Sequence, residues 1–506
     1  MHVLFVERHG LEETEVPVDL DHQPADLVIL SFSDSDLGAF AAGWQRAKTQ
    51  NEHDFPSIRL ANLASLKHPI SVDTYIEKTL RHASGILVRL IGGVPYWSYG
   101  LNQVAQIAKR HNIAFAVIPA DGRSDKQLDE ISSVPVSTLR RLQHLCEIGG
   151  EVAAHSALAQ LALAAGLYAS PVSGSKMIGN VGAWTPEHNL CCPFIARGFE
   201  PKPLILITFY RSFITAADLK PITALFNKLR DYGFDVMSLF VPSLKAPDAA
   251  YWLERQIVHY SPAFIINATS FSGRGKDGRS PLDIANVPVF QIALSTSNRA
   301  AWAEADRGLS PADMAMHVVL PEVDGRIFAG VASFKEPEAI DEALQFAAIG
   351  HQPDEQRIHA ICDKIANWHR LQTTPLAEQK PALILSTYPG RPWQMAHAVG
   401  LDAIASAKAI LEDLGHPAQS IKKPLESLLN HNTISWDIAS YKTALRELPS
   451  HLQEALNAEW GEPEADSHAI NGAFEFAGLS FGNAVIALQP ERGIKQNKQS
   501  DYHDIS

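Results

Sequence analysis

The residues best suited to chemistry in this sequence are basic, amide and hydroxyl side chains that follow four apolar, β-prone stretches. The stretches are PLILITF, FDVMSLFV, AFIINAT and VPVFQIAL, between residues 203 and 294. Arg and Lys beside small hydroxyl groups suit a polyanionic ligand, because a guanidinium binds a carboxylate through two parallel hydrogen bonds. The side chains that follow the four stretches are Tyr210, Arg211, Lys245, Asn267, Thr269, Arg274, Lys276, Arg279, Ser295, Asn298 and Arg299.

These side chains can act together only if the four stretches form neighbouring strands. Helical stretches separate the first three, at Lys220 to Tyr232 and at Pro247 to His259. This alternation predicts a mostly parallel, flavodoxin-like sheet whose strand ends lie at one edge, where open α/β sheets bind ligands. The residues that we predict to bind substrate at this edge are Tyr210, Arg211, Asn267, Ser295 and Arg299.

Two further segments near this edge bear on the prediction. Arg274, Lys276 and Arg279 lie in the polar segment SGRGKDGRS, which is also typical of a solvated loop. Further on, HVVLPEV and RIFAGVASF are apolar runs joined by Asp324-Gly325, a pair favoured in hairpins, so we expect two more strands there.

The same alternation recurs along the chain and predicts an α/β protein of several doubly wound, mostly parallel-sheet units with helical additions. In the first unit the strand candidates are HVLFVE, DLVILSF, GILVRLIGG and IAFAVIPA, and a long helix is expected over residues 136–168. The predicted divisions are an N-terminal α/β domain at 1–170, a linker or long loop at 171–202, a flavodoxin-like domain at 203–350 and a third, incomplete α/β domain at 351–506.

The third unit is expected to open with a strand in PALILSTYP and to close with a strand at 484–488. Helices are predicted over 403–414, 424–429, 435–448 and 450–460.

Composition excludes several classes of function. The 506 residues carry a formal net charge of −13, which argues against DNA or an anionic membrane as the main partner. The longest apolar stretch, Ala157 to Ala169, is shorter than the ~20 residues that span a bilayer, and the N-terminus lacks the features of a signal peptide. Four cysteines without a CxxC pair are typical of a reducing compartment, so we expect a cytoplasmic protein.

Short motifs do not define a reaction. The sequence has no HExxH and no EF-hand loop, the polar strand ends at residues 31–36 and 92–97 do not match GxGxxG, and SGRGKDG does not match the phosphate-binding GxxxxGK pattern. His317, His397 and His431 are each able to ligate a metal, but a single histidine is more often structural. Glu322 and Asp324 are paired carboxylates, although an Asp before Gly also has a structural explanation in a turn. We therefore assign no catalytic or metal-ligating residue.

A longer string of segments resembles one family, the CobN-type large subunit of aerobic cobaltochelatase, which is related to the large subunit of magnesium chelatase. The most similar segments are GLSPADMAMHVVLPEVDGRI and VASFK, and TFYRS, NATSFS and QIALSTSNRAAW also agree. In order along the chain the segments are 59–83, 89–101, 208–212, 267–272, 291–302, 308–327, 331–335, 388–389, 399–402 and 491–504. Members of the family are well over twice this length, so the resemblance implies the N-terminal portion of such a subunit.

The resemblance implies a concrete function. The chain would be the tetrapyrrole-binding subunit of an ATP-dependent cobaltochelatase, a ligase that forms coordination bonds by inserting Co²⁺ into hydrogenobyrinic acid a,c-diamide in cobalamin biosynthesis. ATP and Mg²⁺ would be handled by AAA+-type motor subunits as partners. The substrate carries several carboxylates, which agrees with the basic strand edge. Two alternatives are a non-catalytic tetrapyrrole carrier or scaffold and a magnesium chelatase large subunit.

Overall fold

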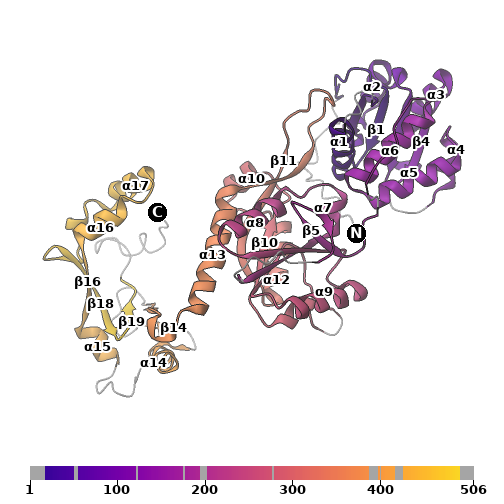
Figure 1. Cartoon of the computed structure of the whole chain (residues 1–506). Helices are drawn as coiled ribbons and strands as arrows, with labels where there is room; N and C mark the ends of the chain where they lie inside the picture. Colours follow the sequence, from indigo (N-terminus) through magenta and orange to yellow (C-terminus); the bar gives the residue numbers. More distant parts are fainter. Residues whose placement is uncertain are drawn as a thin grey trace. The chain divides into compact units, whose positions relative to one another are not determined.

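The computed structural model describes residues 17–50, 55–120, 124–174, 177–193, 202–275, 278–386, 397–398, 401–415 and 425–490. The chain forms two compact units, Met1–Ala366 and Asn367–Ser506 (Figure 1). Among the described helices, none combines the length and the apolar character needed to cross a membrane.

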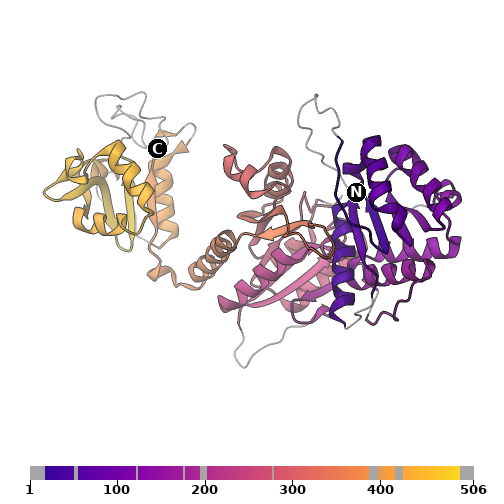
Figure 2. The ribbon, with the colours of Figure 1, turned by 90° about the horizontal axis from the view of Figure 1, so that it is seen from above.

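The first unit contains a four-stranded parallel sheet in the order β2-β1-β3-β4. Helices cover both faces, as Figure 2 shows from above. Leu27 and Ile29 of β1 pack in the core beside α1, α5 and α6, whereas Val28 and Leu30 pack in the core beside α2 and α3. The elements are β1 Leu27–Ser31, α1 Asp34–Thr49, β2 Ile58–Asn62, α2 Pro69–Lys78, β3 Gly85–Leu90, α3 Ser98–His111, β4 Ala114–Pro119, α4 Lys126–Ile131, α5 Val136–Ile148 and α6 Gly150–Ala164.

Sequence and structure differ at two places in this part of the first unit. The long helix expected over 136–168 is two helices, because Gly149 and Gly150 adopt φ of +72° and +79°, which no α-helix tolerates. Strand β2 was missed, although Ile58–Asn62 is a largely apolar run. The expected strand HVLFVE lies outside the described residues.

An eight-stranded sheet completes the first unit, in the order β12-β11-β10-β9-β7-β8-β5-β6. Its five central strands, from β11 to β8, are parallel, which confirms the predicted flavodoxin-like alternation. The strands are β5 Gly182–Thr185, β6 Asn189–Cys191, β7 Leu204–Tyr210, β8 Asp235–Val241, β9 Phe264–Asn267, β10 Val289–Leu294, β11 Ile327–Pro337 and β12 Ile349–Pro353. The main helices are α7 Arg211–Thr215, α8 Lys220–Asp231, α9 Pro247–Tyr260, α10 Arg299–Glu304 and α13 Glu355–Thr373.

The segment before β11 corrects one prediction. HVVLPEV is helical rather than extended, so Asp324-Gly325 does not join a hairpin. The elements here are α11 Pro311–Met314, a π-helical turn at Ala315–Val319 and α12 Leu320–Val323. A short apolar run with β-branched residues fits a strand or a partly buried helix equally well, and the helix-starting pair Ser310-Pro311 was the discriminating signal. Residues 171–202, expected as a linker or loop, contain β5 and β6. The predicted domain boundaries stay predictions.

The connection between β11 and β12 links the two sheets of the first unit. Leu344 in this connection is 1% exposed and belongs to the core beneath the four-stranded sheet. Gln45 of α1 also donates a hydrogen bond from Nε2 to Asp341 Oδ2, at 3.1 Å. Figure 1 shows the β11–β12 connection extending toward α1. Buried contacts therefore fix the eight-stranded sheet relative to the four-stranded one.

The second unit contains a mixed sheet in the order β13-β19-β18-β16, with β17 paired to β18. Only the β13–β19 pair is parallel. The helix expected over 435–448 is wrong at its start, because Thr433–Asp437 forms β16 and α16 begins at Ile438. The elements are β13 Ala382–Leu385, β14 His397–Ala398, β15 Leu401–Asp402, α14 Ala403–Asp413, α15 Leu425–His431, β16 Thr433–Asp437, α16 Ile438–Leu445, α17 Ser450–Trp460, β17 Ala469–Ile470, β18 Ala473–Phe481 and β19 Ala484–Leu488. The α/β fold class is thus confirmed, with parallel and mixed sheets.

Candidate functional site

The carboxyl edge of the eight-stranded sheet gathers the predicted substrate-binding residues. Strands β10, β9 and β7 are adjacent, so Ser295, Asn267 and Tyr210 lie at the ends of three neighbouring strands. The other two predicted residues flank this group: Arg211 begins α7 and Arg299 begins α10. The parallel register therefore brings three of the five together, as expected for strand ends in an open α/β sheet.

Asn267 is fully engaged by protein groups. Its side chain is buried, and its Oδ1 accepts hydrogen bonds from Thr208 Oγ1 at 3.0 Å and from Thr269 Oγ1 at 2.8 Å. Its Nδ2 donates to Gln291 Oε1 at 2.8 Å, and Gln291 Nε2 donates to the Thr269 carbonyl at 2.7 Å. A buried polar network in which the members satisfy one another makes the strand ends rigid. The amide of Asn267 thus shapes the edge rather than facing outward from it.

Ser295 is engaged in a second buried network, centred on Asp313. The Asp313 carboxylate accepts from Ser295 Oγ, from Thr296 N and from Thr296 Oγ1, each at 3.0 Å. Ser295 and Asp313 have no exposed surface. Three donors compensate the buried carboxylate, because hydrogen bonds replace the lost hydration of its charge. Asp313 was not among the predicted residues; the Ser310-Pro311 helix start just before it was the available signal.

His317 lies one turn beyond Asp313, in the π-helical turn. Its Nε2 is 3.9 Å from Asp313 Oδ1, and its buried Nδ1 has no partner among the described residues. Burial lowers the pKa of His317, while the Asp313 charge opposes that shift. π-helical turns are frequent at functional sites, and a buried histidine without a partner at Nδ1 adds to that indication.

Tyr210 and Arg211 connect the strand ends to neighbouring loops. Tyr210 donates its hydroxyl proton to the Ser270 carbonyl at 2.7 Å. Arg211 donates from Nε to the Gly179 carbonyl at 3.0 Å and from Nη2 to the Ile178 carbonyl at 3.2 Å. Burial lowers the pKa of Arg211, though a guanidinium stays charged at neutral pH. Its Nη1 has no acceptor within the described part of the chain.

Arg299 lies on the β11 side of the group. Its Nε donates to Asp354 Oδ2 at 2.9 Å, and its backbone N–H donates to Glu336 Oε1 at 2.6 Å. The side chain remains 54% exposed. Arg299 is therefore a tethered but accessible cation at the edge of the group.

A cavity of about 320 Å³ lies between the two sheets of the first unit and was not predicted. One wall is the first turn of α1, at Asp34 and Ser35, which follows the carboxyl end of β1. The opposite wall includes Ser212 to Lys220, after the carboxyl end of β7. Strand ends of both sheets therefore border one space. The polar segment Ser31 to Asp36, directly after an apolar strand, was the signal in the sequence.

The cavity contains ionisable groups in unusual environments. Asp218 Oδ1 accepts the backbone N–H of His351 at 2.9 Å, and burial raises the pKa of Asp218. Burial, followed by the nearby Lys335 and His317, lowers the pKa of His351 to about 3. Lys220 Nζ is 2.6 Å from Glu338 Oε1. Of these groups Asp218, a carboxyl with a raised pKa, is the one suited to exchange a proton with a group that enters the cavity, whereas His351 stays neutral.

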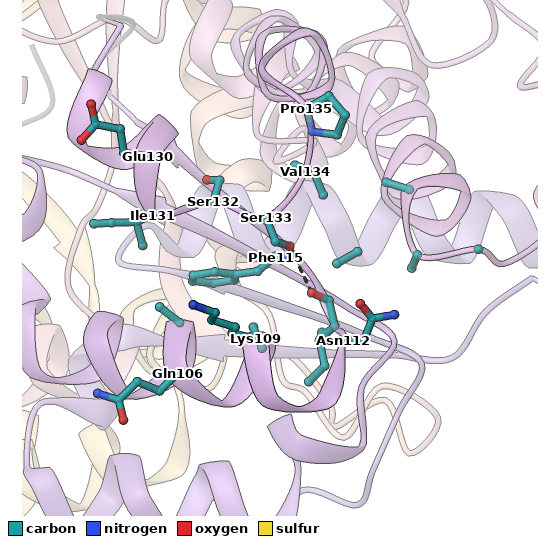
Figure 3. A pocket seen from close by; sticks show the side chains of 17 residues that line it. Gln106, Lys109, Asn112, Phe115, Glu130, Ile131, Ser132, Ser133, Val134 and Pro135 are labelled. Carbon is teal, nitrogen blue, oxygen red and sulfur yellow. Dashed lines mark hydrogen bonds between the residues drawn. The ribbon is translucent and has the colours of Figure 1, made fainter.

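A second cavity, of about 870 Å³, lies beside the edge strand β4 of the four-stranded sheet (Figure 3). Ser133 Oγ accepts from Phe115 N at 2.8 Å and donates to the Ile113 carbonyl at 3.1 Å. These bonds pair backbone groups at the free edge of β4. Among the described residues that line the cavity, only Lys109 and Glu130 are charged. The cavity borders the amino end of β4, away from the strand ends that carry the predicted residues.

No group of three or more His, Cys, Asp or Glu suited to a metal ion occurs among the described residues. Of the three histidines considered from the sequence, His431 hydrogen bonds through Nδ1 to the Ser427 carbonyl at 2.7 Å. His317 lies in the buried network above. The side chain of His397 is outside the described part of the structure.

Comparisons with known proteins find relatives of one family. A family model described as CobN/Magnesium Chelatase matches residues 153–506. The aerobic cobaltochelatase subunit CobN of Sinorhizobium sp is 32% identical over 99% of this chain and 41% of that protein. The CobN protein of Pseudomonas aeruginosa is 30% identical over 100% of this chain and 42% of that protein.

One solved structure shares the fold. The catalytic subunit of cobaltochelatase from Mycobacterium tuberculosis matches 93% of this chain and 39% of its own, with a TM-score of 0.70 at 24% identity. The chain thus spans about two fifths of the length of the relatives that it matches.

Proposed function

Because the chain belongs to the CobN/magnesium chelatase family, we propose that it is the tetrapyrrole-binding part of an ATP-dependent cobaltochelatase. In this proposal the enzyme inserts Co²⁺, as substrate metal, into hydrogenobyrinic acid a,c-diamide. The observation that carries the proposal is the identity of 32% and 30% to two CobN subunits along almost the whole chain. A magnesium chelatase protein of Rhodobacter capsulatus is 24% identical over only 58% of the chain, which favours the cobalt branch.

The proposal assigns ATP and Mg²⁺ to partner motor subunits of the AAA+ type. The 506 residues contain no GxxxxGK[ST] sequence, the loop that binds nucleotide phosphates in such motors. The function of this chain would then be to hold the ring while the motor subunits supply the energy for insertion.

We place the ring at the carboxyl edge of the eight-stranded sheet. Arg211, through Nη1, and the exposed Arg299 would pair with carboxylates of the substrate, and Tyr210 would contact the ring between them. Asn267 and Ser295 would act by fixing the strand ends, because their side chains are buried in the two networks. The cavity of about 320 Å³ is at the lower end of the ~300–1,000 Å³ range for small-molecule pockets, so it suits one substrate side chain rather than a substituted macrocycle.

The first experiment is an absorbance and fluorescence titration of the chain with hydrogenobyrinic acid a,c-diamide. We expect saturable binding, and an Arg211→Ala variant should bind about tenfold more weakly, since it loses a charged hydrogen-bond donor. Arg110→Ala, an exposed arginine at the end of α3, is the matched control and should bind as the wild type does. A folded wild-type chain that does not bind the ring contradicts the proposal.

A second experiment separates an enzyme part from a carrier. The chain is mixed with the motor subunits, ATP, Mg²⁺, Co²⁺ and the ring, and the spectral change on cobalt insertion is followed. Product formation supports the chelatase function. Ring binding without product supports the alternative of a non-catalytic carrier or scaffold. Replacing Co²⁺ by Mg²⁺ and the ring by a porphyrin tests the magnesium chelatase alternative.

A further inference from the structure

The helical segment 311–323 exposes a set of apolar side chains beside the carboxyl edge of the eight-stranded sheet. Val319 is 50% exposed, Leu320 39% and Val323 66%. Val323 lies four residues after Val319 and three residues after Leu320, and side chains at these spacings are neighbours on a helix surface, so the three form one patch. The segment is anchored by the buried side chains of Asp313 and His317. Exposed apolar side chains that lie together, with polar residues around them, are a feature of ligand-binding and partner-binding surfaces.

Phe271 extends this patch from the loop after β9. Its side chain is 44% exposed, and its backbone N–H donates to the Met316 carbonyl at 2.7 Å. Phe271 adopts a φ of +67°, which is strained for an aromatic residue. Such strain persists only where surrounding contacts enforce it, and it is concentrated at functional sites.

Hydrogen bonds to Asp324 hold this loop against the end of α12. Ser272 Oγ donates to Asp324 Oδ1 at 2.8 Å, and Gly273 N donates to Asp324 Oδ2 at 2.6 Å. Gly273 also lies against Leu244, because a Cβ on Gly273 would be 2.9 Å from Leu244 Cδ1. The loops after β8 and β9 and the segment 311–323 therefore form one continuous surface.

Basic side chains border the apolar patch. Arg274 is 44% exposed, with Nε 3.5 Å from Asp324 Oδ1. Lys245, next to Leu244, and Arg279 are exposed on the same loops. The acidic side chain exposed on the helical segment is Glu322. Among the described residues this surface thus carries the three exposed cations and two exposed carboxylates, Glu322 and Asp283, of which Asp283 is paired with Arg326, in a chain whose net charge is −13.

We propose that Phe271, Val319, Leu320 and Val323 form a docking platform for the flat face of a tetrapyrrole, with Lys245, Arg274 and Arg279 binding its peripheral carboxylates. This inference rests on the function proposed above and identifies where the ring would lie. The match is one of shape and charge: the macrocycle has an apolar face and an anionic rim, and the platform has an apolar centre and a cationic border. Tyr210 joins the platform to the predicted strand ends, because its hydroxyl donates to the carbonyl of Ser270, next to Phe271.

The test compares ring binding by the wild type with binding by a Val319→Asp/Val323→Asp double variant. Fluorescence titration with hydrogenobyrinic acid a,c-diamide should show at least a tenfold higher Kd for the double variant, since charged groups replace apolar contacts under the ring. Val258→Asp is the matched control, because Val258 is 60% exposed on α9 of the same unit. Arg274→Ala should weaken binding at low salt and reduce its salt dependence.

The outcomes separate the platform from the general function. If wild type and double variant bind the ring equally, the platform is wrong and the tetrapyrrole-binding function stands. If the folded wild type does not bind the ring, both are wrong. If the double variant keeps ring binding but loses association with the motor subunits, the surface is a protein interface instead. Circular dichroism checks the fold, and Val323→Asp alone, at the most exposed position, replaces a double variant that does not fold.

Discussion

Arg59 Nη1 donates a hydrogen bond to the carbonyl oxygen of Ala343 at 2.9 Å, which joins residues 284 positions apart in the chain. Arg59 belongs to β2 of the four-stranded sheet, and Ala343 lies in the connection between β11 and β12 of the eight-stranded sheet. Arg59 is buried, and burial lowers the pKa of its guanidinium. A buried donor to a backbone carbonyl at this place fixes the two sheets in one orientation, and the cavity between their strand ends depends on that orientation.

Leu344→Ala should destabilise the first unit by about 3 kcal/mol. Leu344 comes from the β11–β12 connection and packs in the core beneath the four-stranded sheet, so the substitution leaves a cavity there. Urea unfolding followed by tryptophan fluorescence measures the loss. Ile340→Ala is the control on the same connection, since Ile340 is 70% exposed and should change stability by less than about 0.5 kcal/mol. Equal losses at both positions would mean that the connection does not pack as a core element.

Gly43→Ala should destabilise the packing of α1 against α6. A Cβ at Gly43 would be 2.6 Å from the backbone nitrogen of His155, closer than real contacts, so the two helices must move apart. We expect a loss of about 1–3 kcal/mol in thermal or urea unfolding. Gly38→Ala in the same helix is the matched control: its nearest atom would be 3.9 Å away, so higher helix propensity should leave stability equal or raise it by up to about 1 kcal/mol.

Asp313→Asn should lower the stability of the first unit by about 2–4 kcal/mol. Ser295 Oγ, Thr296 N and Thr296 Oγ1 donate to the two carboxylate oxygens of Asp313. In asparagine an NH₂ group replaces one of these oxygens, so it would face a donor and lose that hydrogen bond. Asp306→Asn, at an exposed position in the loop between α10 and α11, is expected to be neutral. Equal denaturation midpoints for the two variants would contradict the role given to the network.

His351 should make the first unit less stable in acid. Its pKa is about 3 in the folded protein, against about 6.5 when unfolded, so below pH 6.5 the unfolded chain binds a proton that the folded chain does not. The contribution of His351 to the free energy of unfolding is complete above pH 6.5 and falls as the pH drops toward 3. Between pH 7.5 and pH 5 the free energy of unfolding should fall by about 2 kcal/mol because of His351.

The measurement for His351 is urea unfolding of the wild type and of His351→Gln at pH 7.5 and pH 5. Glutamine does not titrate, so the variant should lose about 2 kcal/mol less than the wild type between the two pH values. The difference between the two proteins isolates His351 from the buried His317, which titrates in both. An identical pH dependence in the two proteins would show that His351 already carries its proton in the folded state.

Local patterns were sufficient for much of the fold. The apolar runs of β7, β8, β9 and β10 and the helices between them are evident from hydrophobic periodicity and from helix-ending glycines such as Gly233. The family was also recognisable, because ordered segments along the whole chain agree with the CobN type. Periodicity failed in HVVLPEV, where a short apolar run is helical, and at Gly149-Gly150, where two positive φ values divide one expected helix.

The sequence by itself therefore determined most parallel strands of the first unit, their alternation with helices and the polar residues at their ends, since these depend on neighbours within a few positions. Only the tertiary structure decided which of those residues are accessible. Asn267 is bonded to Gln291, 24 positions away, and Ser295 to Asp313, 18 positions away. The inter-sheet cavity and the Arg59–Ala343 contact join still more distant segments. Such pairings depend on how whole elements pack, because buried polar groups take whichever partner the assembled core brings within hydrogen-bond distance.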